Sequence, residues 1–143
     1  MSAEDNKAMH RRVYEEIWNQ KNPALIDEVI SDDYIYHLPA SVPVNDPRGP
    51  EGYKDIFHLF INAFPDVNLH IEDMIAEGDL VTVRSTCSGT HRGDYMGSAP
   101  TGKQFSVMEM AIVRYKDGKI VEEWGGLERL DLIQQLGISP PTY

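Results

Sequence analysis

The sequence predicts an α+β fold in which three N-terminal helices pack on a curved antiparallel sheet, which closes into a cone-shaped α+β barrel. Apolar residues recur at three- and four-residue steps up to Phe64, the period of a helix. From Val67 onward they recur at every second position, the period of a strand. Gly78–Asp79 and Asp117–Gly118 each separate two alternating runs, as hairpin turns do. Because helices and strands are segregated along the chain, the pattern favours α+β over a doubly wound α/β fold.

The first helix is indicated by Met9, Val13 and Ile17, which are four residues apart and form one apolar face over about four turns. Tyr14 and Trp18 lie beside that face. The second helix is expected to begin with Asn22 as N-cap and Pro23 as its first residue. Its apolar side consists of Leu25, Ile26, Val29 and Ile30. Residues 34–37 are expected to be extended.

The third helix is expected to begin at Pro50 and to end before Pro65, since proline disfavours helical geometry in the residue that precedes it. It is the most aromatic element, with apolar positions at Tyr53, Ile56, Phe57, Phe60, Ile61 and Phe64. Four strands follow at 67–77, 80–90, 104–116 and 119–127. A short helix over 130–136 should end at Gly137, a residue typical of helix C-termini.

Composition restricts the function classes. The 143 residues suffice for one domain over 1–143, and a net charge of −10 argues against a nucleic-acid backbone or an anionic membrane surface as partner. Cys87 is the single cysteine, so an intrachain disulfide and a thiolate metal framework are excluded, and no histidine pair has metal-ligand spacing. No apolar run approaches a membrane span and no signal peptide is evident. We therefore expect a cytoplasmic protein without a metal.

Strand alternation places two carboxylates on the inward face of the predicted sheet. The inward set of 104–116 is Phe105, Val107, Glu109, Ala111 and Val113, and that of the last strand is Val121, Glu123, Gly125 and Leu127. A carboxylate among apolar neighbours is costly to ionise unless it is paired. Glu109 is therefore either a general acid or base with a raised pKa, a carboxylate bound across the sheet by Arg84, a tyrosine or a histidine, or a solvated strand end. Glu123 has the same alternatives, and the structural role suits it better because it lies near the strand's open end.

The opposite set of 104–116, with Met108, Met110 and Ile112, is also apolar. In a one-layer antiparallel sheet that face would normally be wet. A homodimer is expected to cover it, with a terminal helix as the alternative.

Other side chains are candidates for the pocket between helix and sheet. His91 lies where a strand ends, and it either takes part in catalysis or holds the loop. The expected ligand contacts are His37, Phe60, Phe64, Met96 and Trp18. The segment 97–103 is similar to a phosphate-binding P-loop, but Gln104 replaces the required Ser or Thr and a strand follows. It is therefore expected to be a loop.

Several segments together resemble one family. They are Phe64-Pro65-Asp66, Ala76-Glu77-Gly78-Asp79-Leu80-Val81, Gly89-Thr90-His91-Arg92-Gly93, Met96-Gly97 through Pro100-Thr101-Gly102, Asp117-Gly118-Lys119-Ile120 and Gln135-Leu136-Gly137. In this order, over about residues 5 to 137, the chain resembles the SnoaL-like polyketide (ester) cyclases of the nuclear-transport-factor-2-like superfamily. The resemblance implies a cone-shaped α+β barrel, dimers or tetramers, no cofactor, and ring closure by intramolecular aldol condensation.

The resemblance also implies an acid/base aspartate at position 125 and an assisting histidine at position 111, where this chain has Gly125 and Ala111. Neither can remove a proton. Glu109 and Glu123, each two residues away, are expected to replace them in a cofactor-free cyclase, isomerase or lyase that acts on an apolar carbonyl compound. In that enzyme Glu109 is the base, and His91 or Glu123 is its partner. The alternative is a non-catalytic small-molecule-binding module. An epoxide hydrolase, which needs an arginine between two aspartates, fits less well because Arg114 faces away from Glu109.

Overall fold

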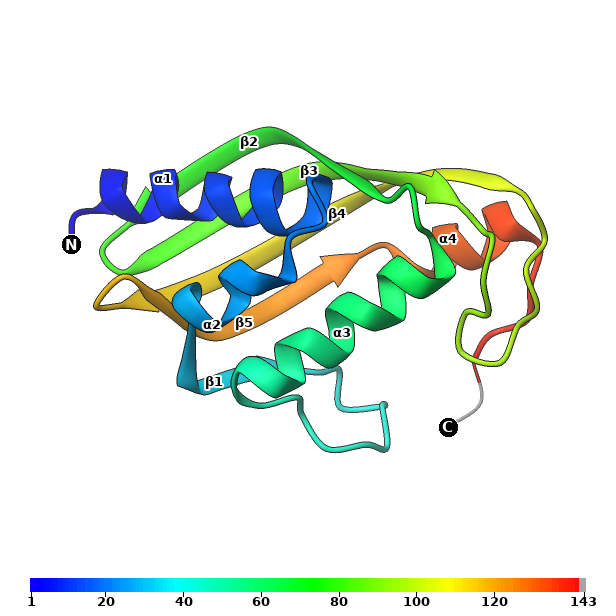
Figure 1. The fold of residues 1–143 in the computed structure, drawn as a ribbon, viewed down its shortest axis with the longest axis horizontal. Helices are drawn as coiled ribbons and strands as arrows, with labels where there is room; N and C mark the ends of the chain where they lie inside the picture. Colours follow the sequence, from blue (N-terminus) through cyan, green and yellow to red (C-terminus); the bar gives the residue numbers. More distant parts are fainter. Residues whose placement is uncertain (142–143) are drawn as a thin grey trace.

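The computed structural model describes residues 1–141 and shows helices packed against a curved five-stranded sheet (Figure 1). The strands are β1 (Ile30–His37), β2 (Asn68–Glu77), β3 (Leu80–Thr90), β4 (Gln104–Lys116) and β5 (Lys119–Leu127). Their order in the sheet is β1-β5-β4-β3-β2. Three of the four pairings are antiparallel, and β1 pairs with β5 in parallel. The predicted α+β class with a curved sheet is confirmed, and the sheet is antiparallel, as expected, except at the β1–β5 pair.

The N-terminal helix changes its geometry halfway. Helix α1 (Ala3–Arg12) begins at a capping box between Ser2 and Asp5 and continues directly into a π-helix, η1 (Val13–Asn19). The i→i+5 bond of a π-helix is present where Gln20 N–H donates to the Glu15 carbonyl. The expected apolar face at Val13 and Ile17 is buried, and Tyr14 and Trp18 are buried as well. The π-helix therefore buries two adjacent rows of side chains, Val13 with Ile17 and Tyr14 with Trp18.

The second predicted helix is shorter than expected. It consists of a 3-10 turn, η2 (Pro23–Leu25), capped by the Asn22 side chain, and a single α-turn, α2 (Ile26–Val29). Ile30, predicted as helical, is the first residue of β1 and pairs with Ile120 on β5. Pairing with a strand distant in sequence therefore overrides the local helical pattern.

Helix α3 (Gly49–Ala63) lies across the concave side of the sheet, and α4 (Arg129–Leu136) ends at Gly137 in the left-handed conformation, as predicted (Figure 1). The bounds of β3, β4 and β5 coincide with the predicted ones, and β2 begins one residue later. At the β4–β5 turn, Asp117 and Gly118 both have positive φ, which is the geometry of a type I′ hairpin. Segment 97–103 is a loop, as expected.

Burial on β4 follows the predicted alternation. Phe105, Val107, Glu109, Ala111 and Val113 are buried, while Met108, Met110 and Ile112 are 41–47% exposed. On β5 the alternation is interrupted, because Arg114 pairs with Glu122 and Tyr115 with Ile120. The resulting bulge at Val121 turns Ile120 into the core, where it is 1% exposed. The prediction that Val121 faces inward and Ile120 outward is wrong for this reason, whereas Glu123, which pairs with Val113, keeps its inward position.

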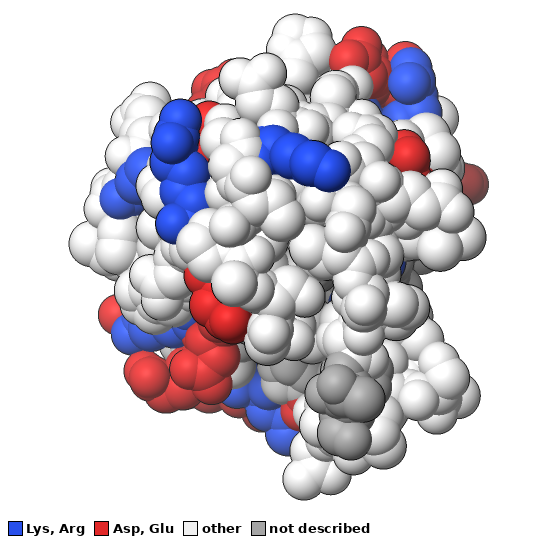
Figure 2. All heavy atoms as spheres, turned by 90° about the vertical axis from the view of Figure 1, so that its right-hand side faces the viewer, with Lys and Arg blue, Asp and Glu red and all other residues white. Residues whose placement is uncertain are grey.

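The surface at the end of the sheet is largely uncharged. In Figure 2, which shows this end, Lys and Arg side chains are dispersed among uncharged ones, and Asp and Glu side chains gather mainly at the lower left. Among residues 1–141, no helix is both long and apolar enough to cross a membrane.

Candidate active site

A cavity of about 330 Å³ lies between α3, η1 and the inner face of the sheet. Most side chains that line it are apolar or aromatic, and the polar exceptions are few. The apolar and aromatic lining is Trp18, Leu38, Val42, Val44, Pro47, Ile56, Leu59, Phe60, Val67, Leu69, Tyr95, Met96 and Leu127, with Tyr14, Tyr36, Tyr53 and Cys87. Such a cavity suits a small apolar ligand whose orientation is set by a few polar groups.

Three carboxylates, Asp55, Glu109 and Glu123, line the cavity. Asp55 is exposed, whereas Glu109 is the most deeply buried of the three, with 8% of its surface exposed. The Tyr14 hydroxyl from η1 donates to both carboxylate oxygens, at 2.9 Å for Oε2. Ser85 Oγ, from the residue opposite on β3, donates to Oε2 at 3.3 Å. Burial raises the pKa of Glu109 to about 7, although both hydrogen bonds favour the anion.

Glu123 is the second carboxylate of the cavity wall with a raised pKa. Its Oε1 accepts a hydrogen bond from the Tyr34 hydroxyl at 2.7 Å, and Tyr34 itself is fully buried on β1. Burial raises the pKa of Glu123 to about 7; the Tyr34 bond opposes this rise and the negative charge of Glu109 adds to it. A pKa of about 7 leaves the Glu123 carboxyl group partly protonated at neutral pH. A general acid that works at neutral pH needs such a proton.

Along the sheet, two small residues of the cavity wall, Ala111 and Gly126, lie between Glu109 and Glu123. Glu123 lies opposite Val113, which is four residues along β4 from Glu109, a separation of about 13 Å measured along the strand. Between these positions Ala111 pairs with Gly125. A flat ligand lying on this part of the sheet would have one carboxylate near each end.

Gly125 could not be replaced by aspartate without moving the backbone. Its φ is +94°, and a Cβ built there would lie 2.3 Å from the Met110 carbonyl oxygen. The Gly125 carbonyl accepts a hydrogen bond from the Tyr36 hydroxyl. The absence of an aspartate at this position is thus built into the conformation of β5.

His91 does not line the cavity. It is fully buried beside Phe64, and its Nδ1 accepts the Thr101 backbone N–H at 3.2 Å. Its backbone N–H and carbonyl bond to Lys103 and Gly102. This geometry matches the loop-holding alternative for His91 and keeps it apart from the two carboxylates.

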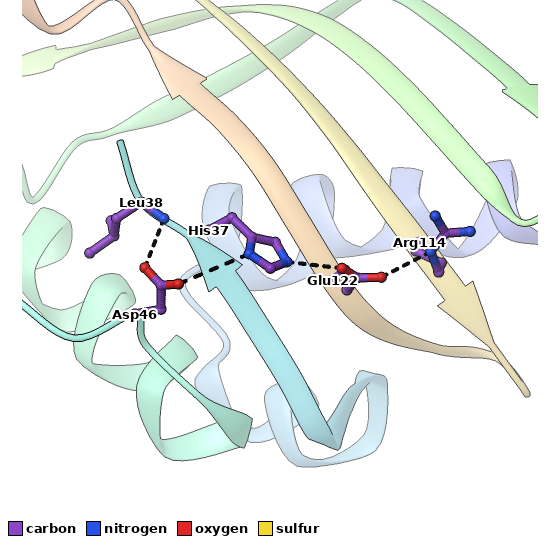
Figure 3. Close-up of polar contacts among 5 residues, drawn as sticks. All are labelled: His37, Leu38, Asp46, Arg114 and Glu122. Carbon is purple, nitrogen blue, oxygen red and sulfur yellow. Dashed lines mark hydrogen bonds and ion pairs between the residues drawn. The ribbon is translucent and has the colours of Figure 1, made fainter. Parts of the chain in front are cut away.

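His37, at the end of β1, does not line the cavity either. It takes part in a chain of polar contacts with side chains of β5, β4 and the loop that follows β1 (Figure 3). Its Nε2 lies 2.9 Å from Glu122 Oε2, and Arg114 Nε donates to the other oxygen at 3.0 Å. Asp46 lies 4.0 Å from His37 Nδ1 and accepts the Leu38 N–H. The chain joins the sheet to the loop at 38–48, which contributes four residues to the cavity lining.

Of the expected ligand contacts, Trp18, Phe60 and Met96 line the cavity, whereas Phe64 is fully buried behind it. Sequence reasoning did not assign roles to Tyr14, Tyr34 or Ser85. Tyr14 could have been found from its spacing, because it lies four residues before Trp18 on a helical element. No group of three His, Cys, Asp or Glu side chains suited to a metal ion occurs within residues 1–141.

The comparisons with known proteins agree with this architecture. The model of the SnoaL-like polyketide cyclase family matches residues 8–136. The aklanonic acid methyl ester cyclase DnrD of Streptomyces peucetius is 28% identical over 125 residues, which span 85% of this chain and 86% of that protein.

Solved structures give the same result. IdmH of Streptomyces antibioticus, a proposed polyketide cyclase, is 31% identical with a TM-score of 0.79, covering 93% of this chain and 99% of that one. A SnoaL-like protein from Jannaschia Sp. CCS1 shares the fold, with a TM-score of 0.86 over 96% and 95% of the two chains at 18% identity. The match over nearly all of the chain, together with the cone-shaped fold, shows that this protein belongs to the SnoaL-like polyketide cyclase family.

Proposed function

We propose that this protein is a cofactor-independent cyclase that closes a ring on a small to medium apolar, polyketide-like carbonyl compound. One observation carries the proposal. Two carboxylates with pKa values raised to about 7 share the wall of an apolar cavity, and each accepts a hydrogen bond from a tyrosine. Pairs of titratable groups held near neutral pH in a cavity are typical of acid/base catalysis.

The hydrogen bonds support different roles for the two carboxylates. Glu109 accepts bonds from Tyr14 and Ser85, and both bonds favour its anion, which suits a general base. Glu123 accepts only the Tyr34 bond and is further disfavoured as an anion by the charge of Glu109, which suits a general acid. Glu123 rather than His91 is the proposed partner because it lines the cavity.

The proposed ring closure has three steps: removal of a proton, formation of a carbon–carbon bond, and donation of a proton. The Glu109 carboxylate removes a proton from the carbon next to a carbonyl group, and an enolate forms. The enolate carbon attacks a second carbonyl of the same molecule, which forms the new carbon–carbon bond while the C=O π bond opens. Glu123 donates its proton to the resulting alkoxide, and proton exchange with water returns Glu109 to the anion and Glu123 to the acid.

Turnover of aklanonic acid methyl ester, the compound in the name of DnrD, is the direct test. We expect Glu109→Gln and Glu123→Gln each to lower kcat by about 10²-fold or more. Glu77→Gln, an exposed carboxylate at the end of β2, is the matched control and should keep wild-type turnover. Unchanged turnover in Glu109→Gln would contradict the proposal.

A non-catalytic binding module is the second candidate. It is favoured by Gly125 and Ala111, which occupy the positions where the resemblance implies the catalytic pair. It predicts that the wild type binds the same ester without converting it, and that Glu109→Gln leaves the Kd unchanged.

We also propose that a second copy of the chain covers the outer face of β4, giving a homodimer or a tetramer. Met108, Met110 and Ile112 are 41–47% exposed on that face. Contiguous exposed apolar side chains are typical of an interaction surface.

A further inference from the structure

Tyr53 places a hydroxyl group in the cavity wall opposite the sheet. It lies on α3, is 5% exposed and lines the cavity. The indole Nε1–H of Trp18, on η1, lies 2.9 Å from the Tyr53 hydroxyl oxygen, and the two rings meet edge to face at 6.2 Å. Two different elements therefore hold this hydroxyl.

The bond to Trp18 leaves the hydroxyl hydrogen of Tyr53 unused. An indole N–H can only donate, so the Tyr53 oxygen must be the acceptor. Within residues 1–141, the Tyr53 hydroxyl donates to no protein acceptor. The phenol hydrogen is thus available to a molecule in the cavity.

Three neighbouring tyrosines differ from Tyr53 in this respect. Tyr14 donates to Glu109, Tyr34 donates to Glu123, and Tyr36 donates to the Gly125 carbonyl. Each of these hydrogens is already committed to the protein. Among these four hydroxyls, Tyr53 is the one that can bind an oxygen atom of a ligand.

The surroundings of Tyr53 keep it a donor. Burial raises its pKa well above the ordinary value, and the charge of Glu123 is the next largest cause. The hydroxyl therefore stays protonated at neutral pH and cannot act as a base. Tyr53 and Glu123, the proposed general acid, both line the cavity and can therefore contact the same ligand.

We propose that Tyr53 donates a hydrogen bond to a carbonyl oxygen of the ligand, and that Trp18 fixes the direction of this bond. The class of ligand is an aromatic or other apolar ketone or ester, because most of the wall is apolar or aromatic and its charged side chains are limited to Asp55, Glu109, Glu123 and Arg129. Under the proposed function, the same bond would stabilise the enolate oxygen as negative charge develops on it. Tyr53 would then be a catalytic residue and Trp18 a positioning residue.

Two ligands that share a carbon skeleton and differ by one oxygen atom test the oxygen site without any reaction. 2-Acetylnaphthalene carries a carbonyl group, and 2-ethylnaphthalene has the same carbon skeleton without oxygen. We expect the wild type to bind the ketone more tightly and to shift its infrared C=O stretch to lower frequency. Tyr53→Phe should weaken ketone binding about 3- to 10-fold, change hydrocarbon binding less than twofold, and abolish the infrared shift.

Variants of the neighbours separate positioning from packing. Trp18→Phe should broaden the C=O band and reduce its shift, since the Tyr53 hydroxyl loses its fixed orientation. Tyr115→Phe is the matched control, because the Tyr115 hydroxyl bonds to His10 Nδ1 and does not line the cavity, and it should leave the band unchanged. A C=O shift that persists in Tyr53→Phe, or equal affinity of the wild type for the two ligands, would overturn the proposal.

The role in catalysis rests on the proposed function and is measured separately. With aklanonic acid methyl ester as substrate, Tyr53→Phe should lower kcat about 10²- to 10³-fold with a smaller change in KM. If the wild type shows no turnover but binds the ketone through Tyr53, the proposed cyclase function fails while the oxygen site stands. Wild-type turnover that is unaffected by Tyr53→Phe would refute the catalytic role.

Discussion

Replacing Glu109 by glutamine should stabilise the protein, and the gain in stability should grow as the pH rises above 4.5. The carboxyl group has a pKa of about 7 in the folded protein, against an ordinary value of 4.5, because it is buried. The folded state therefore binds this proton more tightly than the unfolded state. Stability contributed by the protonated form is fully present below pH 4.5 and is lost as the pH rises toward 7.

The raised pKa sets the size of the effect. A change from 4.5 to about 7 corresponds to roughly 3 kcal/mol, at about 1.4 kcal/mol per pH unit. The wild type should thus lose about 3 kcal/mol of unfolding free energy between pH 4.5 and pH 8 through this group alone. Glu109→Gln removes that loss, so its advantage over the wild type should be near zero at pH 4.5 and reach a few kcal/mol at pH 8.

Urea unfolding of both proteins at several pH values between 4.5 and 8 measures this difference. Glu77→Gln serves as the control, since Glu77 is exposed at the end of β2 and its replacement should not change the pH dependence. The reasoning is refuted if Glu109→Gln is the less stable protein at pH 8. That result would mean that Tyr14 and Ser85 hold Glu109 as a structural anion, whose loss leaves buried donors without an acceptor.

Three further predictions concern neighbouring positions. Gly125→Asp should destabilise the fold by about 1–3 kcal/mol or more in urea unfolding, and should not restore activity, because the positive φ and the Met110 carbonyl exclude a side chain. Tyr14→Phe removes a hydrogen bond that favours the Glu109 anion, so it should raise the pKa of Glu109 further. The acid limb of the kcat/KM–pH profile should then move to higher pH, and a limb that does not move would belong to another group. Met110→Asp should convert the expected homodimer into a monomer in sedimentation analysis, and an unchanged sedimentation coefficient would show that the outer face of β4 is not the interface.

Much of the sheet could be predicted because its determinants are local. The two-residue period defines which side chains of β4 share a face, and it places Glu109 inward without knowledge of any partner. Hairpin turns such as Asp117–Gly118 are determined by residues that tolerate positive φ. The bounds of β3, β4 and β5 follow from these two signals.

The errors arose where distant segments meet. Ile30 was predicted as helical and instead pairs with Ile120, ninety residues away. The bulge at Val121 reversed the inward and outward assignment at the start of β5. Neither feature has a signal in the neighbouring residues, because both depend on how β1 and β4 align with β5.

The sequence by itself determined the fold class, the family and the inward position of both carboxylates. Only the tertiary structure decided the surroundings that give those carboxylates their chemistry. Tyr14 reaches Glu109 across 95 positions of sequence, and Tyr34 reaches Glu123 across 89. The physical reason is that periodicity defines the direction of a side chain, whereas burial and hydrogen bonding depend on which other element packs against it.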